Sequence, residues 1–450
     1  MKLENKKVTI IGAVRSGEAA ALLLKKLGAI PFVSDMASQE KIEKAVETFR
    51  REGISFETGG HTDRVYDADI MIVSPGVPSD APIVVEAKKR DIRIISEIEL
   101  AWSLCNASVV AITGTNGKTT TTALMEHIFL CAGKAAKAAG NIGVPFSSLC
   151  LDTPADGVVA LEVSSFQLDT IDSFKPSVSM ILNITPDHLN RYENSFAQYA
   201  ASKHRITMNQ DATDLLILNA DDPGLQQFPP TTRATVMQFS MEQKITDGAY
   251  TENGFLICAR DGKEMFRFEL AQATLRGPHN AMNMMAAAIA ALWMGVTAES
   301  LTDALRSFPG VEHRIEDCGE KNGIRFINDS KATNVDSVWY ALGSFDYPIY
   351  LILGGRDKGN DYGRIEEPVL KKVKKVYAIG ESAEKVERYF TGKVPVSRKT
   401  DLKDCVESVL KEAEEGSVLL LSPACASFDM FDSYEHRGKV FKQAVSDMLQ

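Results

Sequence analysis

"AITGTNGKTTTT", residues 111–122, joins an apolar run to a helix-forming stretch through a glycine-containing loop. The run VVAIT is typical of a buried β-strand, and TTTTALMEHIFLCAGK predicts a helix. A strand, a glycine loop and a helix in this order are the setting of a phosphate-binding loop. The usual motif places its first glycine where Ile112 stands, whereas this chain has Gly114. The stretch therefore predicts a nucleoside triphosphate site built on a short loop.

Side chains in and near this loop suit phosphate and magnesium. Lys118 is placed to meet the β- and γ-phosphates, and Thr119 or Thr120 can hold Mg²⁺. Glu162 ends the otherwise apolar strand VVALEVS, where an unpaired buried carboxylate would be costly. We interpret Glu162 as a Mg²⁺ ligand, with a salt bridge to a lysine or arginine as the alternative.

Strands and helices alternate on both sides of the loop. KVTIIG, a helix ending near Gly28, and ADIMIVSPG precede it; VSMILNI and DLLILNA follow. ENGFLICARDGKEMFRFEL has the period of two and the Asn-Gly and Asp-Gly turns of an antiparallel patch. A further series contains IRFIND, IYLILGG, KVYAIG and SVLLLSP. We therefore expect a three-domain α/β protein. Its domains are an N-terminal Rossmann-like parallel sheet (1–99), a central P-loop ATPase-type, mostly parallel sheet with a small antiparallel patch (100–309), and a C-terminal Rossmann-like domain (310–450).

Composition narrows the functional classes. The net charge of −10 over 450 residues, without a long basic run, argues against a nucleic-acid or anionic-membrane partner. Seven scattered cysteines without a CxxC pair argue against a disulfide framework or structural zinc. No apolar run reaches the about 18 residues of a membrane span, and the N-terminus lacks a signal-peptide layout. We expect a cytoplasmic protein.

The first glycine turn, residues 12–17, resembles a dinucleotide site without completing it. A dinucleotide fingerprint needs a glycine where Val14 stands, although Asp35 follows at the expected strand end. This pattern favours a Rossmann-like site for a ligand other than NAD, with a purely structural turn as the alternative. Arg15 can supply charge to a diphosphate or simply be solvated.

Two candidates in the middle of the chain stay open on the residues alone. Asp187 and His188 follow a strand, where a histidine can bind a metal, contact substrate or form a loop hydrogen bond. Lys203 falls on the same helix face as Tyr199, which can turn it inward, but most helical lysines are solvated.

Four polar loops of the expected C-terminal domain lie at strand or domain ends. They suggest a ligand-facing rim, although each is also compatible with a structural role. They are HRIE (313–316), NDSKATN (328–334), GGRDKG (354–359) and SPACASFDMFDSYEHRG (422–438).

Together the motifs resemble the Mur ligase family of peptidoglycan synthesis, over essentially the whole chain. The matching stretches are GTNGKTT, GNIG, LEVSSFQL, PDHLNRY, YAASKHRI, HNAMN, HRIE, NDSKATN, GGRDKG and SPACASFDMF. The short GxxGK[T/S] loop is the normal form in that family. The chain is most similar to the members that add D-glutamate to UDP-N-acetylmuramoyl-L-alanine.

The resemblance implies an enzyme that uses ATP and Mg²⁺ at two sites. It implies catalytic roles for Lys118, Glu162, His188 and Lys203, and metal ligation by Thr119, Glu162, His188 and Lys203, the last as a CO₂-derived carbamate. It implies ATP contacts by Gly114, Thr115, Asn116, Gly117, Lys118, Thr119, Thr120, Asn280, Arg314 and Asp329.

It also implies two further sets of substrate contacts. The UDP-substrate would meet Val14, Arg15, Asp35, Ser74, Pro75, Gly76, Asn141 and Ser164, and D-glutamate would meet Lys331, Thr333, Lys358, Ser427, Phe428 and Tyr434. Arg15 is bulkier than the usual family residue, and Tyr434 stands where phenylalanine is frequent.

The implied reaction is ATP-driven amide formation through an acyl phosphate, by a monomer. The rival functions are a sibling ligase for another amino acid, a folylpolyglutamate-synthetase-like ligase, a dehydrogenase using the first domain, and a non-enzymatic nucleotide-binding protein. A complete N-terminal module argues against the folate enzyme, and Val14 argues against the dehydrogenase.

Overall fold

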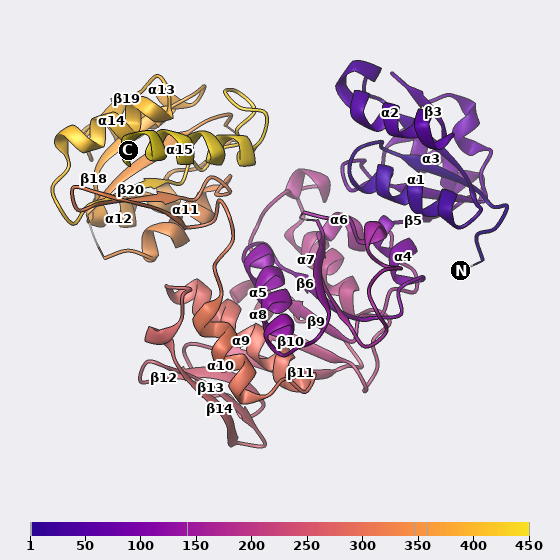
Figure 1. Cartoon of the computed structure of the whole chain (residues 1–450), viewed down its shortest axis with the longest axis horizontal. Helices are drawn as coiled ribbons and strands as arrows, with labels where there is room; N and C mark the ends of the chain where they lie inside the picture. Colours follow the sequence, from indigo (N-terminus) through magenta and orange to yellow (C-terminus); the bar gives the residue numbers. More distant parts are fainter. Residues whose placement is uncertain (1, 142, 347, 358, 450) are drawn as a thin grey trace. The chain divides into compact units, whose positions relative to one another are not determined.

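Three β-sheets organise the chain in the computed structural model, which describes residues 2–141, 143–346, 348–357 and 359–449 (Figure 1). All three carry helices, so the predicted three-domain α/β class is confirmed. Within the described ranges, no helix combines the length and apolarity that crossing a membrane requires.

The first sheet is parallel throughout, in the order β3-β2-β1-β4-β5. Successive residues of its strands face opposite sides: Ile10 joins the core with α1 and α2, whereas Ile11 joins the core with α3. The elements are β1 (Lys7–Ile11), α1 (Ser16–Lys26), β2 (Ile30–Asp35), η1 (Gln39–Ile42), α2 (Glu43–Glu52), β3 (Ser55–Thr58), η2 (Asp63–Tyr66), β4 (Ile70–Val73), α3 (Pro82–Lys89), β5 (Arg93–Ile95) and α4 (Glu97–Trp102).

The second sheet has the order β14-β13-β12-β11-β10-β9-β6-β8-β7 and places β6 among buried parallel strands. Its antiparallel end is made by two-residue hairpins. Asn253 and Gly254 have φ of 52° and 82°, and Asp261 and Gly262 have 50° and 71°, the positive values that such turns require. The predicted antiparallel patch is therefore confirmed.

The strands of this sheet are β6 (Ser108–Thr113), β7 (Ala136–Gly140), β8 (Val158–Glu162), β9 (Val178–Ile181), β10 (Leu215–Asn219), β11 (Thr235–Ser240), β12 (Gly248–Glu252), β13 (Phe255–Arg260) and β14 (Lys263–Glu269). Its helices are α5 (Lys118–Cys131), η3 (Phe146–Ser148), α6 (Ser165–Leu168), η4 (Leu189–Arg191), α7 (Phe196–His204), η5 (Arg205–Thr207), α8 (Pro223–Gln227), η6 (Leu270–Gln272), α9 (Pro278–Trp293) and α10 (Ala298–Ser307). Helix α5 packs against β7, β8 and α10, which fixes the loop in front of it.

The third sheet has the order β15-β16-β20-β17-β18-β19, with one apolar core beneath α11, α12 and α13 and another beneath α14 and α15. Its edge strand β15 runs antiparallel, whereas the Rossmann-like domain expected from the sequence has parallel strands. The strand reads EDCGEK and is only half buried, so it has no apolar pattern. The elements are β15 (Glu316–Lys321), β16 (Ile324–Asn328), α11 (Val335–Gly343), β17 (Ile349–Gly354), α12 (Gly363–Lys372), β18 (Val373–Ile379), α13 (Ala383–Phe390), β19 (Val396–Arg398), α14 (Leu402–Glu412), β20 (Val418–Leu421) and α15 (Tyr434–Leu449).

The chain divides into two compact units. The first holds the first two sheets, in Met1–Ala273 and Ala281–Phe308, and the second holds the third sheet with the segment Thr274–Asn280. The domain boundaries predicted after residues 99 and 309 stay predictions.

Candidate active site

The loop between β6 and α5 is held open by glycines and by one asparagine. Gly117 has a φ of 85°, and a Cβ there would lie 2.5 Å from Asn283 Oδ1, so no other residue fits without displacement. Asn183 Oδ1 accepts the N–H groups of Thr115 (3.1 Å) and Asn116 (2.8 Å). The loop is thereby shaped before any ligand binds, with the N-terminus of α5 behind it.

Lys118 begins α5 and folds back over the loop. Its Nζ donates to the carbonyl oxygens of Gly114 and Thr115, each at 2.8 Å. The ammonium therefore lies on the loop that the sequence predicts to hold phosphate.

Glu162 and Thr119 form the carboxylate–hydroxyl pair expected of a magnesium site. The Thr119 hydroxyl donates to Glu162 Oε2 at 2.8 Å, and Asn141 Nδ2 donates to Oε1 at 3.1 Å. Glu162 is buried at the end of β8. Hard oxygen donors of this kind suit Mg²⁺, so the residues fit the ion.

Lys203 points inward from α7, on the face it shares with Tyr199. Its Nζ donates to Gly114 O at 2.9 Å and lies 4.6 Å from the centre of the Tyr199 ring. Burial, and secondly the nearby Lys118, lower the pKa of Lys203 well below its ordinary value; Asp187, Glu162 and Asp169 partly oppose them. Burial therefore favours the neutral, nucleophilic form of the amine over the ammonium.

His188 lies in the loop after β9, with the left-handed φ of 51°. Its ring meets Phe166 edge-on at 5.4 Å, and its Nε2 lies 3.6 Å from Asp187 Oδ2. Its side chain is half exposed, so a ligand can reach it.

In the first sheet, Asp35 organises the glycine turn. Its two carboxylate oxygens accept the N–H groups of Ala13 and Ala37, both at 2.7 Å. A Cβ at Gly12 would lie 2.6 Å from Ser74 Oγ, so the first turn and the turn after β4 pack closely together. Val14 is exposed at their edge.

In the third sheet, the predicted residues cluster at strand ends. Asp329 accepts the Ser422 hydroxyl at 2.8 Å, and burial raises its pKa to about 7, partly opposed by Arg314. Lys331 Nζ lies 5.5 Å from the Tyr434 ring centre. Ser427 is buried and Phe428 is exposed. Lys358 lies outside the residues that the structure describes.

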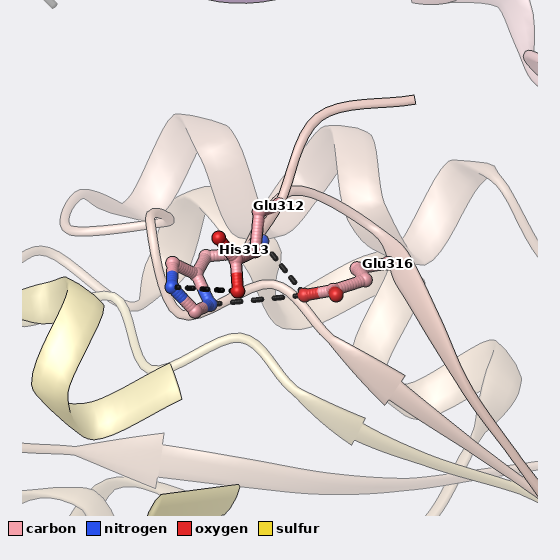
Figure 2. A group of neighbouring side chains, drawn as sticks. All are labelled: Glu312, His313 and Glu316. Atoms are coloured by element: carbon pink, nitrogen blue, oxygen red, sulfur yellow. Dashed lines mark hydrogen bonds and ion pairs between the residues drawn. The ribbon is translucent and has the colours of Figure 1, made fainter. Parts of the chain in front are cut away.

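Glu312, His313 and Glu316 are the only three His, Cys, Asp or Glu side chains, within the described ranges, whose ligand atoms all lie within 4.8 Å of one another (Figure 2). The two carboxylates face different ring nitrogens, Nε2 at 3.8 Å and Nδ1 at 3.7 Å. Lys442 Nζ contacts both carboxylates, at 3.0 and 2.5 Å. The group is therefore an ion-pair cluster in which the Lys442 ammonium balances one of the two carboxylate charges.

Sequence reasoning missed Asn183 and Arg437. Asn183 lies two residues after the end of β9, and a polar residue after an apolar strand was the available signal. Arg437 is buried and donates to Ser330 Oγ (2.9 Å), Ser330 O (2.7 Å) and Cys425 O (3.1 Å), which ties two of the predicted rim loops together. Its burial lowers its pKa to about 10.

Three family models match the chain. They are the MurD N-terminal domain over residues 7–83, the Mur ligase middle domain over 112–291, and the Mur ligase glutamate ligase domain over 313–425. The chain belongs to the Mur ligase family.

Curated members of the Mur ligase family match over the full length. The UDP-N-acetylmuramoylalanine–D-glutamate ligase of Salinibacter ruber is 44% identical, with 98% of both chains covered. The ligase of the same name from Bacteroides fragilis is 42% identical, with 98% of this chain and 100% of the relative covered.

Solved Mur ligase structures share the fold. The UDP-N-acetylmuramate–alanine ligase MurC of Thermotoga maritima has a TM-score of 0.63 at 20% identity, covering 98% of this chain and 100% of that one. The MurF ligase of Thermotoga maritima in complex with ADP has a TM-score of 0.62 at 15% identity, covering 93% and 95%.

Proposed function

We propose that the chain catalyses ATP-dependent amide bond formation between UDP-N-acetylmuramoyl-L-alanine and D-glutamate, in peptidoglycan precursor biosynthesis. The observation that carries the proposal is the 44% identity, over 98% of both chains, to a relative named for this reaction. The gathering of Lys118, Glu162 and Lys203 around one glycine loop supports it.

The proposed chemistry has two steps. The terminal carboxylate of the UDP-substrate attacks the γ-phosphorus of ATP, the bond to ADP breaks, and an acyl phosphate forms. The amine of D-glutamate then attacks the acyl carbon, phosphate leaves, and the amine loses a proton. Two anions meet in the first step, so positive charge and aligned N–H groups contribute most.

Lys118 and the loop would hold the transferred phosphate. The Lys118 ammonium now spans the carbonyls of Gly114 and Thr115 and can turn toward a phosphate at the N-terminus of α5. The hydroxyl of Thr119 and the carboxylate of Glu162 would hold Mg²⁺, which neutralises phosphate charge when bound. His188, half exposed in its loop, is our candidate for the second metal or for substrate.

We further propose that Lys203 carries a carbamate. Its neutral amine can attack CO₂, forming an N–C bond and releasing a proton, which leaves an anion with two oxygens. Burial and the neighbouring Lys118 favour the neutral amine before the reaction, and Lys118 then faces an anion. A carbamate would also add oxygen ligands for Mg²⁺.

The remaining contacts also stay proposals. The turns at 12–17 and 74–76, whose tight packing leaves Val14 exposed, would meet the UDP moiety. The D-glutamate contacts would be Lys331, Thr333, Lys358, Ser427, Phe428 and Tyr434, and the further nucleotide contacts would be Asn280, Arg314 and Asp329.

An amino-acid panel with ATP and UDP-N-acetylmuramoyl-L-alanine tests the proposal. We expect phosphate release that requires D-glutamate. Turnover with another amino acid instead would indicate a Mur ligase for that amino acid. Turnover with a folate substrate would indicate a folylpolyglutamate-synthetase-like ligase. Lys118→Ala should abolish acyl-phosphate formation while UDP-substrate binding persists; loss of both would contradict the assigned role.

A further inference from the structure

Arg191 joins the second sheet to the first at a single turn. It lies at the end of η4, three residues after His188, and its guanidinium donates to three consecutive carbonyl oxygens: Pro75 at 3.4 Å, Gly76 at 3.3 Å and Val77 at 3.1 Å. A planar guanidinium presents several donors in fixed directions, which suits a row of carbonyls better than an ammonium does.

The same guanidinium makes a cation–π contact with an aromatic ring. Its central carbon lies 4.4 Å from the centre of the Phe166 ring. That ring also meets His188 edge-on at 5.4 Å and stacks on Tyr192 at 6.0 Å. Phe166 belongs to α6, which follows Glu162 by only a few residues. Arg191 therefore contacts both the turn after β4 and the surroundings of His188.

We propose that Arg191 is a positioning residue that sets the turn 74–77 at a fixed place relative to the loop 187–192. The inference rests on the proposed function, in which the turn holds the UDP moiety and His188, in the loop, meets the second metal or the substrate. One long substrate would then touch both parts of the chain. Arg191 holds them in register without itself touching the reacting atoms.

The kinetic expectation follows from the sensitivity of catalysis to placement. A misplacement of about 1 Å can cost about a hundredfold in rate. We expect Arg191→Ala to lower kcat by about tenfold to a hundredfold and to raise KM for the UDP-substrate, while KM for ATP stays unchanged. Arg191→Lys should recover little, since the charge returns without the fork of donors.

Arg93 supplies a matched control. Its Nη2 pairs with Asp172 Oδ2 at 2.6 Å, so it also links the first sheet to the second, but at β5 and between exposed side chains. If Arg191 acted only by stabilising the contact between the two sheets, Arg93→Ala would have the same effect on kcat and KM. We expect Arg93→Ala to leave both kcat and KM unchanged.

The test combines steady-state kinetics of the wild type, Arg191→Ala, Arg191→Lys and Arg93→Ala with amide hydrogen exchange. In Arg191→Ala, the amide exchange rates of both the turn 74–77 and the loop 187–192 should increase. In Arg93→Ala they should stay at the wild-type values. Equal kinetics in both alanine variants, or exchange that rises in only one of the two segments, would overturn the inference. If the wild type shows no D-glutamate-dependent turnover, the proposed function is overturned together with the inference. If the wild type is active and Arg191→Ala is equally active, only the inference is overturned.

Discussion

Thr119 and Glu162 meet through a 2.8 Å hydrogen bond between a hydroxyl at the start of α5 and a carboxylate at the end of β8. The two residues come from neighbouring parallel strands and the loops that follow them, since β6 pairs with β8. The carboxyl ends of these strands therefore bring an oxygen-donor pair to the glycine loop.

Glu162→Gln should lower turnover by about a hundredfold, because one charged oxygen ligand for Mg²⁺ is replaced by an amide. The amide keeps the size of the side chain and can still accept from Thr119. We expect the Mg²⁺ concentration needed for half-maximal activity to rise, measured by titration of phosphate release. An unchanged Mg²⁺ dependence would remove Glu162 from the metal site.

Lys203→Ala should be nearly inactive, with partial recovery on addition of short carboxylic acids that replace the carbamate oxygens. Lys137→Ala is the matched control, because Lys137 is exposed on β7. In the wild type, isotope-labelled bicarbonate should give a carbamate resonance in NMR that Lys203→Ala lacks. Full activity of Lys203→Ala would refute the carbamate.

Gly117→Ala should weaken ATP binding by about tenfold or more, since strained backbone costs about 1–3 kcal/mol. The new Cβ would also lie 2.5 Å from Asn283 Oδ1. Calorimetric titration with ATP measures the effect. Gly133→Ala is the control: Gly133 follows the other end of α5, has a φ of 72° and meets nothing within 4 Å. Equal loss in both variants would mean that backbone strain alone, and not the loop, is responsible.

Asp329 should make stability depend on pH. Its pKa rises from the ordinary 3.8 to about 7 on folding, chiefly through burial. Between these values the folded chain keeps a proton that the unfolded chain has lost, so stability falls as pH rises through this window. Asp329→Asn cannot ionise, and its stability relative to wild type should increase across the window by up to about 4 kcal/mol.

Denaturant unfolding of both proteins between about pH 4 and pH 8 measures this difference. Asp346→Asn, at an exposed carboxylate, should give a difference that stays flat with pH. A flat difference for Asp329→Asn as well would show that Asp329 is ionised in the folded protein.

The glycine loop and its sheet could be predicted from sequence because their signals are local. The strand before Gly114 contains the apolar run 109–112, and each hairpin of the antiparallel patch is marked by its Asn-Gly or Asp-Gly pair. The inward direction of Lys203 was only one of two possibilities, since helical spacing fixes a face but not what covers it.

What could not be predicted depends on distant partners. Asn183 accepts from a loop almost seventy positions away, and Arg437 donates to Ser330, 107 positions earlier in the chain. Asn183 has no motif of its own, and Arg437 was not singled out within the polar stretch 422–438. The edge strand β15 escaped prediction because its residues are mostly polar and show no apolar alternation.

One carbonyl oxygen, that of Gly114, accepts from both Lys118 and Lys203. The two amines thus share an acceptor, and each is within the electrostatic reach of the other. With a carbamate on Lys203, dissolved CO₂ and ATP become thermodynamically linked ligands. Carbamate formation would change the affinity for ATP, and bound ATP would change the affinity for CO₂ by the same factor. The activity of such an enzyme would respond to the carbon dioxide level of the cell as well as to its energy charge.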